Sequence, residues 1–312
     1  MLSRTAANLF WAGRYMERAD FGARLVDATT RLSALPSTYG GDPTAWTSAI
    51  EAAGVAEAFA EAHGEPAESA VIQYLTVDPE NPSSIRTCVE RARSNARAVR
   101  TGLTREAWEA LNGAWHDVQR FGVHLPPSRV PELTEAVQRS VSLFDGAAQR
   151  TMLRDDAYWF LQLGSAVERA DNTARLLDVK YNLLLPRDEP VGGSLDYFQW
   201  ATILRTVSAL TAYRWVYRDA VKPWLVADLL IFNSRMPRSL TCCYNHIVEL
   251  MDHLGASTGR RGPATRIASR MQLQLSESDI DQVFASGLHE FIEDFIVQNN
   301  QLGAAVAEQF AF

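Results

Sequence analysis

Cysteine is scarce in this sequence. Only three cysteines occur among the 312 residues, and two of them, Cys242 and Cys243, are adjacent. An odd count without a Cys-x-x-Cys pair argues against a disulfide framework, a zinc ribbon and a thioredoxin-type redox site. Sparse cysteine is typical of proteins in a reducing compartment, so we expect a cytoplasmic location.

Long apolar runs and an excess of positive charge are also missing. No apolar stretch reaches the roughly 18 residues that a bilayer span requires, and the charged N-terminus lacks the apolar core of a signal peptide. The net charge of −7 argues against a nucleic-acid-binding surface, which needs clustered Lys and Arg. We therefore expect a soluble protein with neither a membrane nor a nucleic acid as its partner.

Known catalytic fingerprints are absent too. The sequence contains no Gly-x-Ser-x-Gly, no P-loop and no dinucleotide-binding glycine pattern. Di-iron helical bundles use Glu-x-x-His on facing helices, and such a motif is missing from the charged repeat described below. We expect neither a metal nor a cofactor.

What the sequence does contain is helical periodicity. Apolar residues make up 47 % of the chain, enough for a substantial core, and they recur at spacings of three and four. The sequence therefore predicts an all-α helical bundle. The expected helices span residues 5–33, 44–62, 66–77, 82–101, 104–122, 130–152, 155–185, 195–219, 223–232, 237–254 and 277–309.

One charged segment occurs twice. Residues 13–27 read GRYMERADFGARLVD and residues 164–178 read GSAVERADNTARLLD, with nine of fifteen positions identical. Trp46 and Trp200 begin similar segments, and so do Pro82 and Pro237, each about 150 residues apart. Such self-similarity indicates repeated structural units. We therefore predict a tandem duplication.

The duplication divides the chain into two helical halves, residues 1–150 and 151–312. We expect them to form one integrated domain. Asn81 before Pro82 predicts a helix N-cap at that position, with the proline at the first helical residue, and Pro237 is expected to begin a helix in the same way.

Charged residues of the repeated segment fall on one helix face beside a seam of small apolar residues. In the first copy the charged face contains Glu17, Asp20, Arg24 and Asp27. In the second copy it contains Glu168, Asp171, Arg175 and Asp178. The i,i+4 pairs Asp20–Arg24 and Asp171–Arg175 are expected. Arg18 and Arg169 point to the other flank.

The glutamates differ in their nearest arginine. Glu17 has Arg14 three residues earlier, whereas Ser165 replaces that arginine before Glu168. Glu168 therefore needs a partner from elsewhere, and the other half of the chain is one source. Charges beside a packing seam must be paired, because an unpaired charge there is costly to desolvate.

Two interpretations of this motif follow. In the first, it is a structural ion-pair network that fixes the two halves in register. In the second, it is a functional cluster in which Glu17 and Glu168 are catalytic acid–base groups. The ligand-binding residues would then be Arg18, Asp20, Arg24, Arg169, Asp171 and Arg175.

Aromatic residues also crowd residues 197–224, interleaved with arginines. Core packing of rings against guanidinium groups is the more ordinary interpretation. An exposed part of this segment would suit a partner-binding face.

With these motifs the chain resembles the bacterial alpha-E family, which is described as an all-helical domain with a recurring Glu-Arg motif. The resemblance covers essentially the whole chain. It is carried by SRTAANLFWAGRYMERAD (3–20), NPSSI (81–85), NARAVR (95–100), LTREAWEALN (103–112), AVERADNTARLLD (166–178) and MPRSL (236–240).

The resemblance implies a partner. Members of the family are typically encoded beside, or fused to, a circularly permuted ATP-grasp protein, often with a transglutaminase-like peptidase nearby. It thus implies an accessory component of a peptide- or amide-forming system. The alternatives are a stand-alone enzyme that uses the Glu/Arg cluster, and a structural scaffold. No ATP-grasp region lies in these 312 residues, so ATP chemistry is expected from a separate partner.

Overall fold

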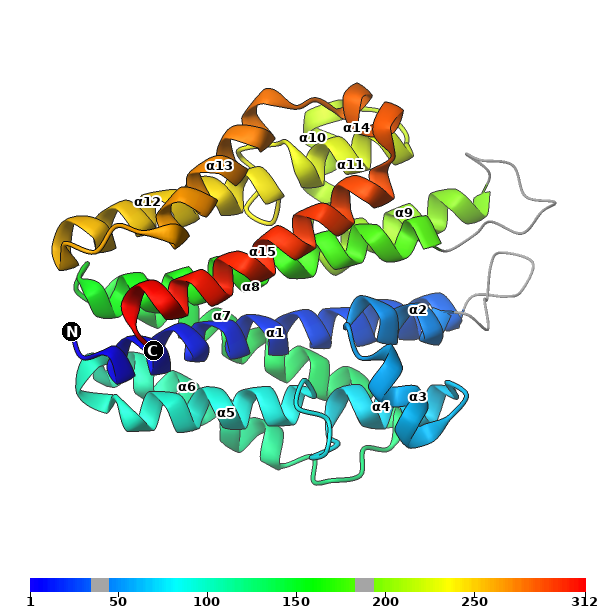
Figure 1. Cartoon of the computed structure of the whole chain (residues 1–312). Helices are drawn as coiled ribbons and strands as arrows, with labels where there is room; N and C mark the ends of the chain where they lie inside the picture. Colours follow the sequence, from blue (N-terminus) through cyan, green and yellow to red (C-terminus); the bar gives the residue numbers. More distant parts are fainter. Residues whose placement is uncertain (35–44, 183–193) are drawn as a thin grey trace.

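The computed structural model describes residues 1–34, 45–182 and 194–312, and this part of the chain folds into α-helices and short 3₁₀ turns without a strand (Figure 1). The all-α prediction is confirmed. The first helices are α1 (Ser3–Ser33), α2 (Ala45–Ala52), α3 (Ala56–His63), α4 (Glu68–Thr76), α5 (Ile85–Ala98), α6 (Arg105–Gln119) and α7 (Val130–Thr151). They are followed by α8 (Asp156–Asn182), α9 (Ser194–Thr206), α10 (Leu210–Tyr217), α11 (Pro223–Ile231), α12 (Leu240–Thr258), α13 (Pro263–Glu277), α14 (Ile280–Ser286) and α15 (Leu288–Phe310).

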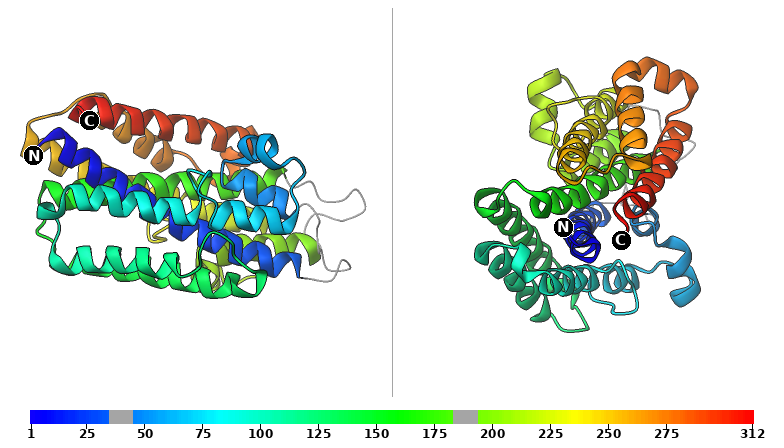
Figure 2. Two further views of the ribbon diagram at one scale, coloured as in Figure 1. Left: turned by 90° about the horizontal axis from the view of Figure 1, so that it is seen from below. Right: turned by 60° about the vertical axis from the view of Figure 1, so that its left-hand side comes forward.

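The long helices α1 and α8 lie side by side at the centre of the molecule (Figure 1). Helices α5 and α7 pack against α1, and α6 packs against both of them. Helices α12 and α15 pack against α8, and α13 packs against both of them. Figure 2 shows these two groups on opposite sides of the central pair. This arrangement is what a duplication would give, although the duplication itself and the halves 1–150 and 151–312 stay predictions.

The two central helices touch at a pair of glycines. A Cβ atom at Gly13 would lie 2.1 Å from the carbonyl oxygen of Leu161, and one at Gly164 would lie 1.9 Å from the carbonyl oxygen of Phe10. Both distances are far inside van der Waals contact, so no other residue fits without moving the backbones apart. The repeated segment begins with these glycines, and its alanines Ala19 and Ala170 are fully buried in the same seam.

Two equivalent helices begin in the same way, but not where the sequence analysis placed them. The N-caps are Ser84 of α5 and Ser239 of α12, whose hydroxyls accept hydrogen bonds from the backbone N–H of Thr87 and Cys242. The predicted N-cap at Asn81 is wrong, because its side chain instead stabilises the preceding turn by accepting from the Ser83 N–H at 2.9 Å.

Other predicted boundaries also shift. Breaks near Gly54, Ser208 and Gly287 divide three of the expected helices, and these residues have φ of 68°, 56° and 106°. Helix α13 was not expected. The predicted residues 183–185 of the α8 helix lie outside the described residues. None of the described helices combines the length and the apolarity that a membrane span requires.

We predict that Gly13→Ala lowers the free energy of unfolding by about 1–3 kcal/mol or more, because the added methyl group overpacks the helix crossing. Gly113→Ala is the matched control. Gly113 lies within α6 with no atom near its Cβ position, so alanine there should raise stability by about 0.5–1 kcal/mol. Urea denaturation measures both changes, and equal effects of the two substitutions would contradict the close crossing.

Candidate functional site

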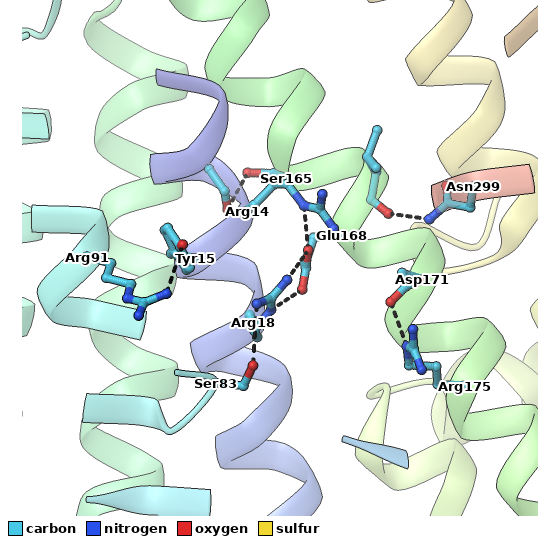
Figure 3. Close-up of polar contacts among 12 residues, drawn as sticks. Arg14, Tyr15, Arg18, Ser83, Arg91, Ser165, Glu168, Asp171, Arg175 and Asn299 are labelled. Atoms are coloured by element: carbon cyan, nitrogen blue, oxygen red, sulfur yellow. Dashed lines mark hydrogen bonds and ion pairs between the residues drawn. The ribbon is translucent and has the colours of Figure 1, made fainter. Parts of the chain in front are cut away.

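Two arginines of α1 converge on a glutamate of α8. Glu168 is 1 % exposed, and Figure 3 shows Arg14 and Arg18 reaching its carboxylate from the neighbouring helix. Arg14 donates from Nε to Oε2 at 2.7 Å, while Arg18 donates from Nε to Oε1 at 2.5 Å and from Nη2 to Oε2 at 3.1 Å. Both oxygens of Glu168 are therefore bound by charged donors from the first half of the chain.

The reciprocal arrangement holds Glu17. Arg169 of α8 donates from Nη2 to Glu17 Oε2 at 2.6 Å. Arg238, in the segment before α12, donates from Nη1 to Glu17 Oε1 at 2.7 Å and from Nη2 to Asp20 Oδ2 at 2.7 Å. The glutamate of each repeated Glu-Arg dipeptide thus pairs with the arginine of the other dipeptide, across the crossing of α1 and α8.

One observed partner differs from the expectation, because Arg14 pairs with Glu168 rather than with Glu17. Arg18 and Arg169 each pair with a glutamate of the opposite central helix. The predicted need of Glu168 for a partner from the other half is met by α1. Ser165, which replaces the second arginine, lies at the crossing, with its Oγ 3.3 Å from the Gly13 carbonyl oxygen.

The expected i,i+4 pairs are present beside these glutamates. Arg24 donates from Nε to Asp20 Oδ2, and Arg175 donates from Nε to Asp171 Oδ2, both at 2.7 Å. Asp27 pairs with Arg31 at 3.1 Å. Oδ1 of Asp20 and of Asp171 are buried without a hydrogen-bond partner, as is Nε of Arg169.

The arginines keep both glutamates ionised. Burial alone would raise the pKa of Glu17, but the attraction of Arg169 and Arg238 outweighs it and lowers that pKa to about 2. Burial is likewise outweighed at Glu168, where Arg14 and Arg18 lower the pKa. A carboxyl group of such low pKa is a poor proton donor or acceptor near neutral pH.

A further acid on α7 faces this centre. Asp145 is half-buried, and its desolvation, together with the charges of Glu17 and Asp20, raises its pKa to about 6 despite the nearby Arg169 and Arg238. Burial disfavours the charged carboxylate, and the nearby acids add repulsion.

The candidate residues do not line one common cavity. Arg18, Glu168, Asp171 and Arg175 line one pocket of about 200 Å³, whereas Arg24 lines another of about 500 Å³. Glu17, Asp20 and Arg169 belong to the ion-pair centre. Within the described ranges, no group of three His, Cys, Asp or Glu residues has the arrangement of a metal site.

A known family matches this chain. The family model Alpha-E, described as "a predicted alpha-helical domain with a conserved ER motif", matches residues 1–311. The chain belongs to the Alpha-E family. The dipeptides Glu17-Arg18 and Glu168-Arg169 fit the ER motif of that description, and in the fold they form the reciprocal exchange between α1 and α8.

Similar proteins occur in mycobacteria. The uncharacterized proteins Mb2597 of Mycobacterium bovis and Rv2567 and MT2643 of Mycobacterium tuberculosis are 26 % identical to this chain over 321 residues. The match covers 94 % of this chain and 35 % of each relative, so the Alpha-E chain spans about a third of their length. No solved structure matches it.

Two important Alpha-E site residues were missed in the sequence. Arg238 aligns with Ser83 in the predicted repeat, a mismatch that mirrors Arg14 against Ser165. Together the two mismatches give each glutamate two arginines. This pair of Arg/Ser mismatches in the repeat was the sequence feature that could have identified Arg238. Asp145 lies outside the repeated segment, and its sequence neighbourhood gave no sign of it.

We predict that Glu168→Gln destabilises the fold by about 3–5 kcal/mol, because it leaves Arg14 and Arg18 without their buried counter-charge. Glu109→Gln is the control. Glu109 forms an exposed i,i+4 pair with Arg105, so its loss should leave stability nearly unchanged. Chemical denaturation distinguishes the two, and a loss below about 1 kcal/mol for Glu168→Gln would refute a structural role.

We also predict a pH-dependent effect at Asp145. Its folded pKa of about 6 exceeds the ordinary value of 3.8, so folding binds a proton between these values and stability falls as pH rises through that window. Asp145→Asn should therefore raise the melting temperature at pH 7.5 by about 2 °C or more, with no gain at pH 3.5. Thermal melts at both pH values test this.

The control for this titration is Asp252→Asn, at an exposed aspartate of α12. It should change the melting temperature little at either pH. A gain for Asp145→Asn that is equally large at pH 3.5 would show that ionisation of Asp145 is not its cause.

Proposed function

We propose that this chain is a helical accessory component of an ATP-grasp-type peptide- or amide-forming system, where it binds the partner ligase and a peptide-like substrate. The observation that carries the proposal is that the relatives are much longer than the region that matches this chain. Each mycobacterial relative contains a counterpart of 94 % of this chain within only 35 % of its own length. An Alpha-E fold joined to a larger partner region suggests a module that works beside another domain.

The family resemblance suggests the identity of the partner. The resemblance implies a circularly permuted ATP-grasp protein, with a transglutaminase-like peptidase as a further component of the same system. ATP-grasp proteins form amide bonds through acyl phosphates, so the substrate of the combined system is an acid that becomes an amide. The helical chain would supply binding rather than ATP chemistry.

The electrostatics favour an accessory role over a stand-alone enzyme. An acid–base role for Glu17 and Glu168 needs carboxyl groups that exchange protons near neutral pH. Each carboxylate instead holds two arginines, and the pKa values of both are lowered. The Glu/Arg cluster is therefore assigned to holding the fold together, and the stand-alone enzyme is the less supported alternative.

An aromatic surface suits a partner. Trp215 of α10 is 75 % exposed and Trp224 of α11 is 47 % exposed, and these two helices pack against each other. Exposed Arg214 and Arg218 lie on the same segment, although the chain as a whole is acidic. Tryptophan and arginine are enriched at binding hot spots. We assign this surface to the ATP-grasp partner, which would present apolar groups bordered by acidic ones.

Co-purification tests the proposal. This chain and the circularly permuted ATP-grasp protein of the same genome should elute together from gel filtration at micromolar concentration. The mixture should also form an amide product from ATP that neither protein forms alone. Trp215→Ser should weaken the association at least tenfold. Leu153→Ser is the control, because Leu153 is 76 % exposed at a different place, before α8.

Absence of association at micromolar concentration would contradict the accessory role. Equal effects of Trp215→Ser and Leu153→Ser would leave the complex standing and would refute the aromatic surface as its interface.

A further inference from the structure

One pocket between α1 and α8 combines a charged end with an apolar wall. It has a volume of about 200 Å³, and Gly54 and Ser83 also line it. Its polar lining consists of Arg18, Ser83, Glu168, Asp171, Asn172 and Arg175. Its apolar lining includes Phe21, Leu25 and Leu75.

The corresponding place in the other half of the molecule is filled by an arginine. There Arg238 donates to both Glu17 and Asp20 at 2.7 Å. The residue at the matching position beside the pocket is Ser83, whose short side chain meets only Arg18 Nη1, at 3.4 Å. The space that a guanidinium group occupies in one copy is thus open in the other.

A second difference between the two copies lies beside the same pocket. Gly54 and Ser208 occupy matching turns, and both have positive φ, at 68° and 56°. Arg24 donates from Nη1 to the Ser208 hydroxyl at 2.7 Å. Gly54 has no side chain, and a Cβ atom there would lie 2.9 Å from Arg175 Nη1. Arg175, which lines the pocket, donates from Nε to Asp171, and its Nη1 lies beside Gly54.

The pocket also contains buried polar atoms without a partner. Asn172 is 5 % exposed, and its Nδ2 has no hydrogen-bond partner. The matching residue in the other copy is the buried Phe21. Asp171 is 7 % exposed, and its Oδ1 is equally unpaired. Oδ1 of Asp20, the equivalent of Asp171, is unpaired as well, so the group that distinguishes this pocket is the Asn172 amide. An unpaired buried polar group costs free energy, and a ligand in the pocket would supply its missing partner.

The polar groups define the ligand. The charged lining of the pocket is balanced, with two arginines, Arg18 and Arg175, and two carboxylates, Glu168 and Asp171. Among the described residues, no hydrogen-bond partner is found for the terminal nitrogens of Arg175 or for the Asn172 amide nitrogen. Together these groups suit a carboxylate, which takes paired N–H donors from a guanidinium.

We propose that this pocket binds an α-carboxylate with its adjacent N–H group, as found at the C-terminus of a peptide or in a free amino acid. The carboxylate lies between Arg175 and the Asn172 amide, and the N–H donates to Asp171 Oδ1. The side chain of the terminal residue packs against Phe21 and Leu75. The inference rests on the proposed function for a peptide-like substrate, and it names the part of that substrate that is held.

Isothermal titration calorimetry with three probes tests the ligand. The dipeptide Ala-Leu should bind, and its C-terminal amide should bind at least tenfold more weakly because it lacks the carboxylate. Free leucine distinguishes the two sources: affinity equal to that of Ala-Leu supports an amino acid, and weaker affinity supports a peptide. No binding of Ala-Leu, equal binding of its amide, or equal binding of acetate would overturn the proposal.

Matched variants test the site. Arg175→Gln should weaken Ala-Leu binding at least tenfold, whereas Arg24→Gln, which breaks the equivalent i,i+4 pair in the filled copy, should leave affinity unchanged. Asn172→Leu should raise the melting temperature, because it removes an unpaired amide, and should weaken binding. Equal affinity in the Arg175→Gln and Arg24→Gln variants would overturn the assignment.

The test of the ligand and the test of the ligase partner can fail independently of each other. Titration of Ala-Leu uses this chain alone, so binding without any ATP-grasp association would refute the proposed function and leave the site standing. Association with the ATP-grasp protein combined with no binding of Ala-Leu would refute the site and leave the accessory role.

Discussion

The carboxylates of Glu17 and Glu168 are buried where α1 and α8 cross, and arginines from other parts of the chain neutralise them. Glu168 is held by α1, and Glu17 is held by α8 and by Arg238. The glycines Gly13 and Gly164 bring the two backbones close enough for these side chains to reach. Other helices of the bundle pack against α1 and α8. The whole bundle therefore depends on the ion pairs between these two helices.

The exchange is reciprocal but not symmetrical. Each glutamate receives two arginines, one from the opposite ER dipeptide and one from a position where the other copy has serine. Arg14 has Ser165 as its counterpart, and Arg238 has Ser83. Arg238 approaches from outside the central pair and fills the space beside it, whereas Arg14 lies on α1 itself. Each glutamate has two arginines, yet the place that Arg238 fills beside Glu17 is taken by the short side chain of Ser83 beside Glu168, where a pocket lies.

Spacing along the sequence was sufficient for the all-α class and for the long central helices α1 and α8, but it missed α13 and the breaks near Gly54, Ser208 and Gly287. The i,i+4 pair Asp20–Arg24 followed from spacing alone. Spacing could not show which helix supplies the arginine that pairs with Glu17, because that depends on how two helices cross. Arg238 was missed for the same reason, since it lies 221 residues from Glu17. The N-cap at Asn81 was wrong because Ser84, three residues later, competes for the same role.

A double-mutant cycle on Glu17 and Arg169 tests most directly whether the ER motif joins the two halves. The free energy of unfolding is measured for Glu17→Gln, for Arg169→Gln and for the double variant. If the two residues form a buried ion pair across the crossing, their coupling energy should be about 1.5–3 kcal/mol. Additive effects, with a coupling below about 0.5 kcal/mol, would contradict the account.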